Sequence, residues 1–248
     1  MSVAAVGSLS IQVTNKTQLQ NPPALLFIHS ANSTKEMWNA VLPHFEQTHQ
    51  MITYDLRAHG ESYLEGRAAL IEADFSMDQM VADLEQVAAT AQLGKFTIVA
   101  NGMGASIGVY FAQKHPDKVL GLILSEFSAE KKESFSSEKL AQLRAFKENH
   151  DLLAQAYSEF VQHGANMSFA SFCAWSQEGR VVSMPDGTWS VRSHPYIAHI
   201  APNGIHRTEA AKKAFQTLPH SVPVLLVEAD EEALPEDFAR AILQFTKA

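Results

Sequence analysis

The stretch Thr97–Tyr110, TIVANGMGASIGVY, decides how the rest of the chain is interpreted. It opens on three β-branched residues, as a buried strand does, and small residues then interrupt the run. From Ala105 onward, apolar residues recur at spacings that suit a buried helix, at Ile107, Val109 and Phe111. The stretch therefore predicts a strand, a sharp turn and a helix.

Strand and helix signals alternate on both sides of this stretch. Buried strands are predicted at Ala24–Ile28, Met51–Tyr54, Lys118–Leu124 and Val222–Glu228, and one or two edge strands within residues 3–13. Capping-box patterns at Ser33 to Glu36 and at Ser76 to Gln79 predict two helix starts, and Gly94 is expected to close the second helix. Helices are also expected from Thr208 and from Pro235. This alternation indicates βαβ units and a mostly parallel sheet, an α/β fold.

The strand signals fade between Ser128 and His206. Residues 130–162 have a helical pattern, and Pro185-Asp186-Gly187 predicts a hairpin turn. We predict a mainly helical lid at 128–206, inserted into a core formed by 1–127 and 207–248.

Composition limits the classes of partner. The 248 residues are 46% hydrophobic, which suits one α/β domain with an insertion. The formal charge is -8 and no basic run exceeds two residues, so nucleic acid is not an expected partner. No basic leader or long apolar run is present, and Cys173 is the one cysteine. We therefore expect a cytoplasmic protein with no membrane span. No His-rich spacing with a nearby carboxylate occurs, so neither a metal nor another cofactor is predicted.

Four segments together resemble the α/β-hydrolase family. They are LLFIHSANSTKEMW, ITYDLRAHGES, IVANGMGASIGVYFAQKHPDKVLGLIL and PVLLVEAD, and they span nearly the whole chain. Within the family, the similarity is greatest to small esterases, lactonases and C–C hydrolases with a helical lid. The resemblance implies an α/β-hydrolase fold with helices on both faces of the sheet.

The family's nucleophile elbow places a serine at the strand-to-helix turn, but this chain has Gly102 there. The resemblance also implies that the backbone N–H groups of Ala31 and Met103 form the oxyanion hole. An engineered Ser-to-Gly change would leave the same sequence, but the absence of a second triad member favours a natural loss.

That second member is the histidine base. In the family it follows one further helix and strand after the acid, whereas the eighteen residues after Asp230 contain no histidine. Either the chain stops early, or the last strand is deleted and the terminal helix follows Glu231-Glu232 directly. In both cases the resemblance implies that the base is missing. Candidate acids are Asp230 and Glu232 after the last predicted strand, and Glu126, which resembles the alternative acid position of some haloalkane dehalogenases.

Further side chains are candidates for ligand binding or loop packing. The ligand-binding candidates are His29, Ser30, Asn101, Phe169 and Trp175. Ser30 and Ala58 stand where the family prefers glycine. For His29, His59 and His115 loop packing is the favoured role; His194, His199 and His206 are placed in or just after the lid. Ser106 is expected to be buried in the helix and is not a candidate nucleophile.

Three functions are compatible with this pattern. The first is a protein without an intact triad that binds a small apolar acyl or carbonyl compound between core and lid. The second is a non-covalent hydrolase or lyase that acts on an ester, lactone or carbonyl substrate, with Glu126 or a lid histidine as base. The third is a non-catalytic interaction subunit, in which an exposed sheet edge pairs with another chain, including a second copy.

Overall fold

A computed structural model describes the core of the chain and short pieces of the segment between its halves. The core ranges are 2–6, 9–15, 17–31, 33–62, 76–127, 209–227 and 235–247. The short pieces are 149–150, 154–155, 157–158, 168–170, 172–173, 181–183 and 189–191.

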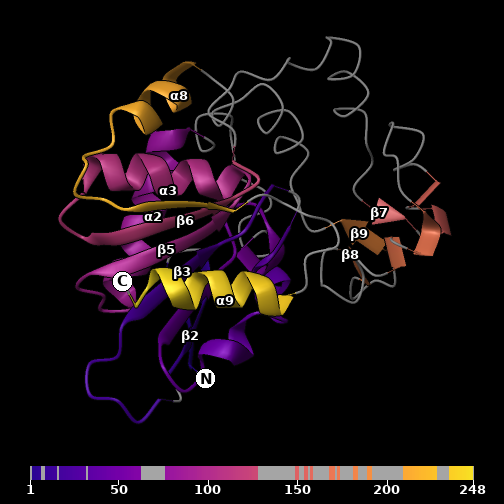
Figure 1. The fold of residues 1–248 in the computed structure, drawn as a ribbon. Helices are drawn as coiled ribbons and strands as arrows, with labels where there is room; N and C mark the ends of the chain where they lie inside the picture. The colour runs from indigo at the N-terminus through magenta and orange to yellow at the C-terminus, as the bar shows by residue number, and fades with distance from the viewer. Residues whose placement is uncertain are drawn as a thin grey trace.

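Seven strands form the main sheet, in the order β1-β2-β4-β3-β5-β6-β10 (Figure 1). The strands are β1 (Ser2–Val6), β2 (Leu9–Thr14), β3 (Ala24–Ile28), β4 (Gln50–Tyr54), β5 (Phe96–Asn101), β6 (Val119–Ser125) and β10 (Val224–Val227). The strands from β4 to β10 pair in parallel, and the β1–β2 hairpin adds antiparallel strands at one edge. The predicted α/β fold with a mostly parallel sheet is confirmed.

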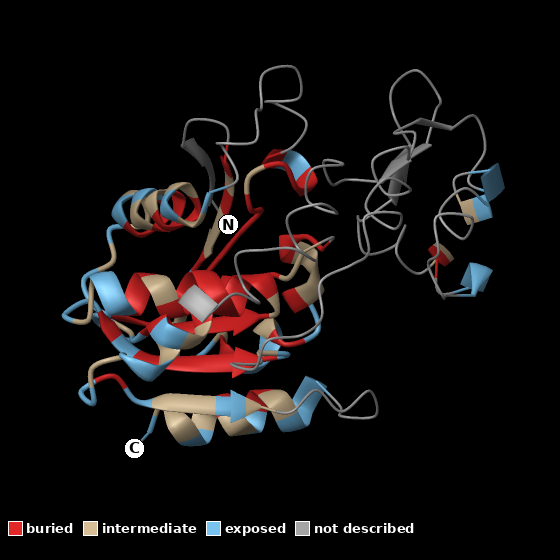
Figure 2. Cartoon of the chain, turned by 90° about the horizontal axis from the view of Figure 1, so that it is seen from above, coloured by how far each residue is buried: buried red, intermediate tan, exposed pale blue. Residues whose placement is uncertain are grey.

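Alternate residues of the central strand β3 feed two separate hydrophobic cores. Leu26 and Ile28 belong to the core under α2 (Met77–Thr90), α3 (Met103–Lys114) and α8 (Glu209–Gln216). Leu25 and Phe27 point to the other face, where they pack with Trp38, Phe45 and Ile242 of α9 (Pro235–Phe245). Figures 1 and 2 show helices on both faces of the sheet and the buried residues concentrated in its centre. Because side chains alternate across a strand, an unbroken apolar run is what a sheet covered on both faces requires.

Helix α2 begins as predicted but ends differently. The side chain of Ser76 accepts a hydrogen bond from the Gln79 N–H, as an N-cap should. At the other end Gln92 is left-handed, with a φ of 54°, and the Leu93 N–H donates to the Ala88 carbonyl. This is a Schellman motif with glutamine in the position that usually holds glycine. The prediction that Gly94 closes the helix is wrong, because the chain has already left the helix two residues earlier.

The helix predicted after β3 is replaced by two short 3-10 turns, η1 (Lys35–Trp38) and η2 (Leu42–Phe45). The Ser33 capping box is wrong: η1 has no side-chain cap, and the Lys35 N–H instead donates to Asp55 Oδ1 at 2.8 Å. Pro43 lies in the first turn of η2 and offers no N–H to continue a helix through it.

Strand β10 is less buried than the sequence predicts. It pairs with β6 in parallel, but its residues are mostly half-buried and Leu226 is 52% exposed. Within the described ranges, no strand pairs with its other edge. The expectation of a strand covered on both faces is therefore wrong for β10.

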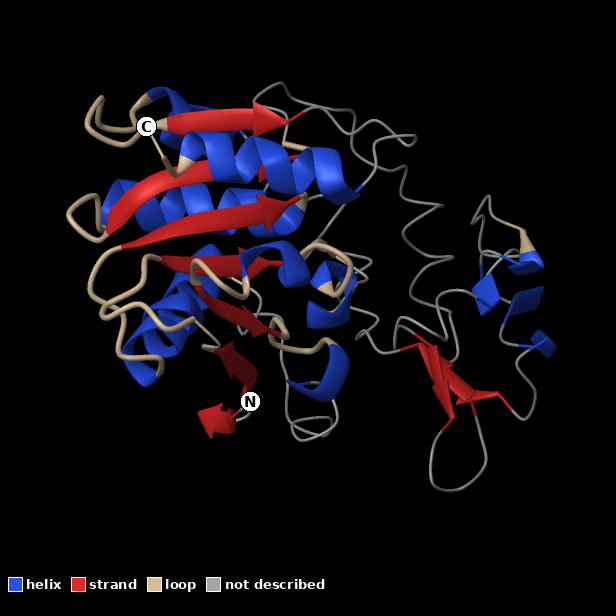
Figure 3. Ribbon diagram, turned by 60° about the horizontal axis from the view of Figure 1, so that its bottom comes forward, coloured by secondary structure: helices blue, strands red, loops and turns tan. Residues whose placement is uncertain are grey.

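A second, three-stranded antiparallel sheet comes from the segment predicted to form the lid (Figure 3). It consists of β7 (Asn149–His150), β8 (Val181–Ser183) and β9 (Trp189–Val191), in the order β7-β9-β8. The pairing of β8 with β9 confirms the predicted hairpin. Its turn residues and most of the predicted helix at 130–162 lie outside the described residues, so the lid boundaries stay a prediction.

Candidate functional site

The candidate site lies where β5 turns into α3. Strand β5 ends at Asn101 and helix α3 begins at Met103, so Gly102 alone makes the turn, with a φ of 53°. The Gly102 N–H donates to the Ser125 carbonyl at 2.9 Å, which anchors the turn to β6. A residue with a side chain pays about 1–3 kcal/mol for such a backbone conformation, and glycine avoids most of that cost.

Ser30 fills the space that a side chain at the elbow would need. A Cβ built on Gly102 would overlap Ser30 Oγ and lie 3.1 Å from Ser30 Cβ. We call the position of this Cβ the elbow point. The Ser30 hydroxyl therefore lies where the side chain of an elbow nucleophile would begin.

A second glycine brings the oxyanion loop against the helix. A Cβ at Gly104 would lie 2.6 Å from the carbonyl oxygens of both Ile28 and His29, so only glycine permits this approach of α3 to the end of β3. The loop that carries Ala31 thus starts beside the first turn of α3. No hydrogen bond joins the N–H of Ala31 or of Met103 to the described part of the chain. First-turn N–H groups have no partner within their helix, so they suit a ligand oxygen.

Glu126 supplies a carboxylate close to the elbow point. Its Oε2 lies 3.8 Å from the elbow point, and its side chain is exposed. It follows the last residue of β6 and has a left-handed φ of 51°. Left-handed residues other than glycine and asparagine are strained and gather at functional sites.

Asn101 ties the ends of two strands together beneath the turn. Its Nδ2 donates to Ser125 Oγ at 3.0 Å, and both side chains are buried. Since the Ser125 carbonyl also receives the Gly102 N–H, these contacts fix the height of the elbow above the sheet. In the structure, Asn101 therefore helps to position the elbow turn.

His29 and His59 form a buried pair behind the oxyanion loop. The Nδ1–H of His29 donates to the Ser30 carbonyl at 2.7 Å, and its Nε2 accepts from the Leu56 N–H at 2.9 Å, which assigns the neutral ring. Burial, and then the neighbouring His29, lower the pKa of His59 to about 3. The two ring centroids are 5.0 Å apart. These contacts agree with loop packing and leave the completely buried His29 no open face for a ligand.

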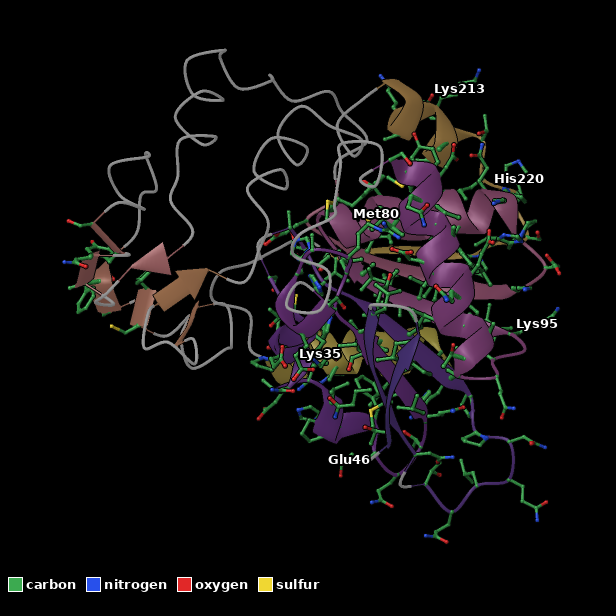
Figure 4. The ribbon with its side chains drawn as sticks, turned by 180° about the vertical axis from the view of Figure 1, so that it is seen from behind. Lys35, Glu46, Met80, Lys95, Lys213 and His220 are labelled. Carbon is green, nitrogen blue, oxygen red and sulfur yellow. The ribbon has the colours of Figure 1, made fainter. Side chains whose placement is uncertain are left out.

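A buried ion-pair network lies beside this loop, and the sequence analysis did not anticipate it. Lys35 Nζ donates to Asp55 Oδ2 at 2.7 Å and to Glu61 Oε2 at 2.8 Å. Burial acts to lower the pKa of Lys35, but the Asp55 and Glu61 carboxylates outweigh it and raise this pKa. Gly60 is required here because a Cβ would overlap the Asp55 carboxylate. Figure 4 shows Lys35 at the opposite end of the sheet from Lys95, which precedes β5.

Within the described part of the chain, no contact places the remaining candidates at the elbow. Ser106 is buried in α3, as predicted, and His115 bonds Glu85 at 2.7 Å. Phe169 is 44% exposed and its ring contacts Tyr157. Outside the described residues lie Asp230, Glu232, Trp175, His194, His199 and His206.

The described ranges contain neither a cluster of metal-binding side chains nor a membrane-spanning helix. No group of three or more His, Cys, Asp or Glu residues there could hold a metal ion. In the same part of the chain, no helix combines the length and hydrophobicity needed to cross a membrane.

The sequence did contain the signal for the Ser30 contact. The family pattern places glycine in the oxyanion loop and serine at the elbow, and here Ser30 and Gly102 hold the opposite residues. Treated one at a time, these substitutions indicate a drifted loop and a lost nucleophile. Treated as a pair, they indicate that the hydroxyl in this small space comes from the oxyanion loop instead of the elbow.

Comparison with known proteins shows the family. Residues 23–223 match the family model of the alpha/beta hydrolase fold. The chain therefore belongs to the α/β-hydrolase family.

The curated relatives are similar over part of their length only. The Escherichia coli protein named "Putative carbamate hydrolase RutD" is 28% identical over 101 residues, which cover 41% of this chain and 36% of that protein. "Protein PHYLLO, chloroplastic" of Arabidopsis thaliana is 29% identical over 101 residues, covering 40% of this chain and 6% of that protein. The matched segment thus spans about a third of the RutD sequence and far less of PHYLLO.

Solved structures share the fold along nearly the whole chain. A marine microorganism esterase superposes with a TM-score of 0.70 at 16% identity, covering 96% of this chain and 98% of its own. The enol-lactonase of Burkholderia xenovorans LB400 gives 0.64 at 14% identity, with both chains fully covered. The thioesterase domain of the curacin biosynthetic pathway gives 0.63 at 20% identity, covering 99% and 89%. At these identities the likeness concerns the fold alone.

Proposed function

We propose that this α/β-hydrolase-fold protein binds a small, largely apolar acyl or carbonyl compound at the elbow and forms no acyl-enzyme at position 102. One observation carries the proposal. The backbone of the elbow is retained, while the Ser30 hydroxyl occupies the space of the absent nucleophile side chain.

The chemistry of the site favours a carbonyl oxygen as the bound atom. The N–H groups of Ala31 and Met103 have no partner in the described part of the chain, and the Ser30 hydroxyl adds a third donor nearby. Gly102 has no side chain with which to attack a carbonyl carbon. A site with donors but no nucleophile at the elbow can hold a carbonyl compound without forming a covalent bond to position 102.

The printed names of similar proteins are consistent with a carbonyl ligand. A carbamate hydrolase, an enol-lactonase and a thioesterase domain are all named for carbonyl compounds. We extend only this shared chemistry to the chain. The lid expected at 128–206 would cover the ligand, and a cytoplasmic location stays a prediction.

Binding of hexanoyl compounds to a proline variant tests the proposal. Met103 is the first residue of α3, where proline is well tolerated, so Met103→Pro removes one N–H without breaking the helix. Met103→Ala is the matched control, because it removes the same side chain and keeps the N–H. In ligand-observed NMR titrations, we expect Met103→Pro to weaken binding about 3–10-fold relative to Met103→Ala, as a lost hydrogen bond should. Equal binding by the two variants, or no binding of any hexanoyl compound, would overturn the proposal.

A second candidate function is turnover without a covalent intermediate, and the position of Glu126 favours it. Its carboxylate lies 3.8 Å from the elbow point, within reach of a water that attacks a bound carbonyl. Hydrolysis of p-nitrophenyl hexanoate tests this role. Turnover above background that Glu126→Gln removes would support it, and turnover absent or insensitive to Glu126→Gln would exclude Glu126 as the base.

A further inference from the structure

We infer that the elbow selects neutral carbonyl compounds that carry an N–H beside the carbonyl group, such as primary amides, and rejects carboxylates. This inference rests on the proposed function and names the ligand class of the same site. It follows from the chemical types of the groups at the elbow, which are several donors and one carboxylate acceptor.

The oxyanion loop and the first turn of α3 supply the hydrogen-bond donors of the elbow. The N–H groups of Ala31 and Met103 and the hydroxyl of Ser30 all belong to the oxyanion loop or the first turn of α3. N–H groups only donate, so they need a ligand acceptor, which a carbonyl oxygen provides.

The opposite requirement comes from Glu126. A carboxylate accepts hydrogen bonds and cannot donate them, and Oε2 lies 3.8 Å from the elbow point. A ligand held by its carbonyl oxygen therefore places its second substituent within reach of an acceptor. An N–H there is satisfied, a methyl group gains nothing, and a second carboxylate oxygen is repelled by like charge.

The backbone at Glu126 is strained. Glu126 holds a left-handed φ of 51° directly after β6, although it is not glycine or asparagine. The side chain makes no ion pair with the described residues, so within those ranges nothing neutralises its charge. An acceptor aimed at the elbow and not paired there is available to a ligand.

Three compounds of one shape separate the possibilities. Hexanamide, 2-heptanone and hexanoate share a pentyl chain on a carbonyl carbon and differ only in the group beside it: NH2, CH3 or O−. NMR titration of the 248-residue protein at neutral pH should give tightest binding for hexanamide, about 3–10-fold weaker binding for 2-heptanone and weaker binding again for hexanoate.

Glu126→Gln is the deciding variant. It removes the negative charge and adds an amide donor, so hexanoate should gain about tenfold or more in affinity relative to hexanamide. Glu85→Gln is the matched control, because it removes a charge near Lys114 and His115 and should leave all three affinities unchanged. Strongest binding of hexanoate by the native protein, or an unchanged hexanoate-to-hexanamide ratio in Glu126→Gln, would overturn the selectivity while leaving the proposed carbonyl site standing. If none of the three compounds bound, both would fail.

Discussion

At the scale of single residues, the elbow depends on one small space shared by two positions. Gly102 leaves that space empty of its own side chain, and Ser30 Oγ occupies it from the neighbouring loop. A glycine at 102 also relieves the strain of a φ of 53°. A glycine at position 102 and a hydroxyl on the loop at position 30 are therefore compatible in packing.

Gln92 offers a test of backbone strain away from the site. It holds a φ of 54° in the Schellman motif that ends α2, and its side chain is exposed. Gln92→Gly should raise the free energy of unfolding by about 1 kcal/mol, because a left-handed residue with a Cβ costs about that much. Urea denaturation measures this change. Gln92→Ala keeps the Cβ and should give no comparable gain; equal gains in the two variants would argue against strain.

His59 makes a prediction about pH. Its pKa is lowered to about 3 in the folded protein, chiefly by burial and then by His29, whereas an unfolded histidine titrates near 6.5. Unfolding between these pH values takes up a proton. The free energy of unfolding should therefore fall as pH falls from 6.5 toward 3, by up to about 1.4 kcal/mol per pH unit from this group.

His59→Asn should flatten that part of the stability profile, measured by urea denaturation at a series of pH values. His220→Gln, at an exposed histidine, is the control and should leave the slope as it is. An unchanged slope in His59→Asn would mean that another group carries the proton uptake.

At the scale of elements, polar contacts hold the turns that the hydrophobic pattern does not specify. Asp55, at the end of β4, accepts the N–H and the ammonium of Lys35 and so fixes η1 to the sheet. Arg57 makes two hydrogen bonds of 2.7 and 2.6 Å to Asp83 and so ties the next turn to α2. These contacts place the loops around the elbow.

Breaking the Lys35 ion pair should be costly. Lys35→Met leaves the buried carboxylate of Asp55 without its cation, and the free energy of unfolding should fall by about 3–5 kcal/mol. Thermal and urea denaturation measure the loss. Adding Asp55→Asn should recover part of it, because the uncompensated charge is then gone. A loss no larger than that from the exposed Arg240→Ala would show that the pair does not hold η1.

The difference between local apolar patterns and distant polar contacts explains which elements could be predicted from the sequence. Strands β3, β5 and β6 and helix α3 follow from apolar runs, because burial on both faces of a sheet determines them locally. The helix expected after β3 failed because the distant Asp55 takes the Lys35 N–H that a local cap would have served. Long-range polar partners leave no periodic trace in a sequence.

At the scale of the whole molecule, the family and its sheet could be predicted from the sequence. The candidate site could be predicted only in part. The oxyanion candidates, Glu126 and the substituted elbow are all readable from motif positions. That Ser30 meets the space above Gly102 depends on how closely β3 approaches α3, which the carbonyl oxygens beside Gly104 reveal only in three dimensions. Candidates in the segment 128–206 and at 228–234 lie mostly outside the described residues.

The most direct measurement of the central claim is a double-mutant cycle between positions 30 and 102, measured as free energies of unfolding. Gly102→Ser alone should destabilise the protein by about 2–5 kcal/mol, from backbone strain together with overpacking against Ser30 Oγ. In the presence of Ser30→Gly the same change should cost about 1–3 kcal/mol less, because the space is then free. Additivity within about 0.5 kcal/mol would contradict the claim that Ser30 occupies the place of the elbow side chain.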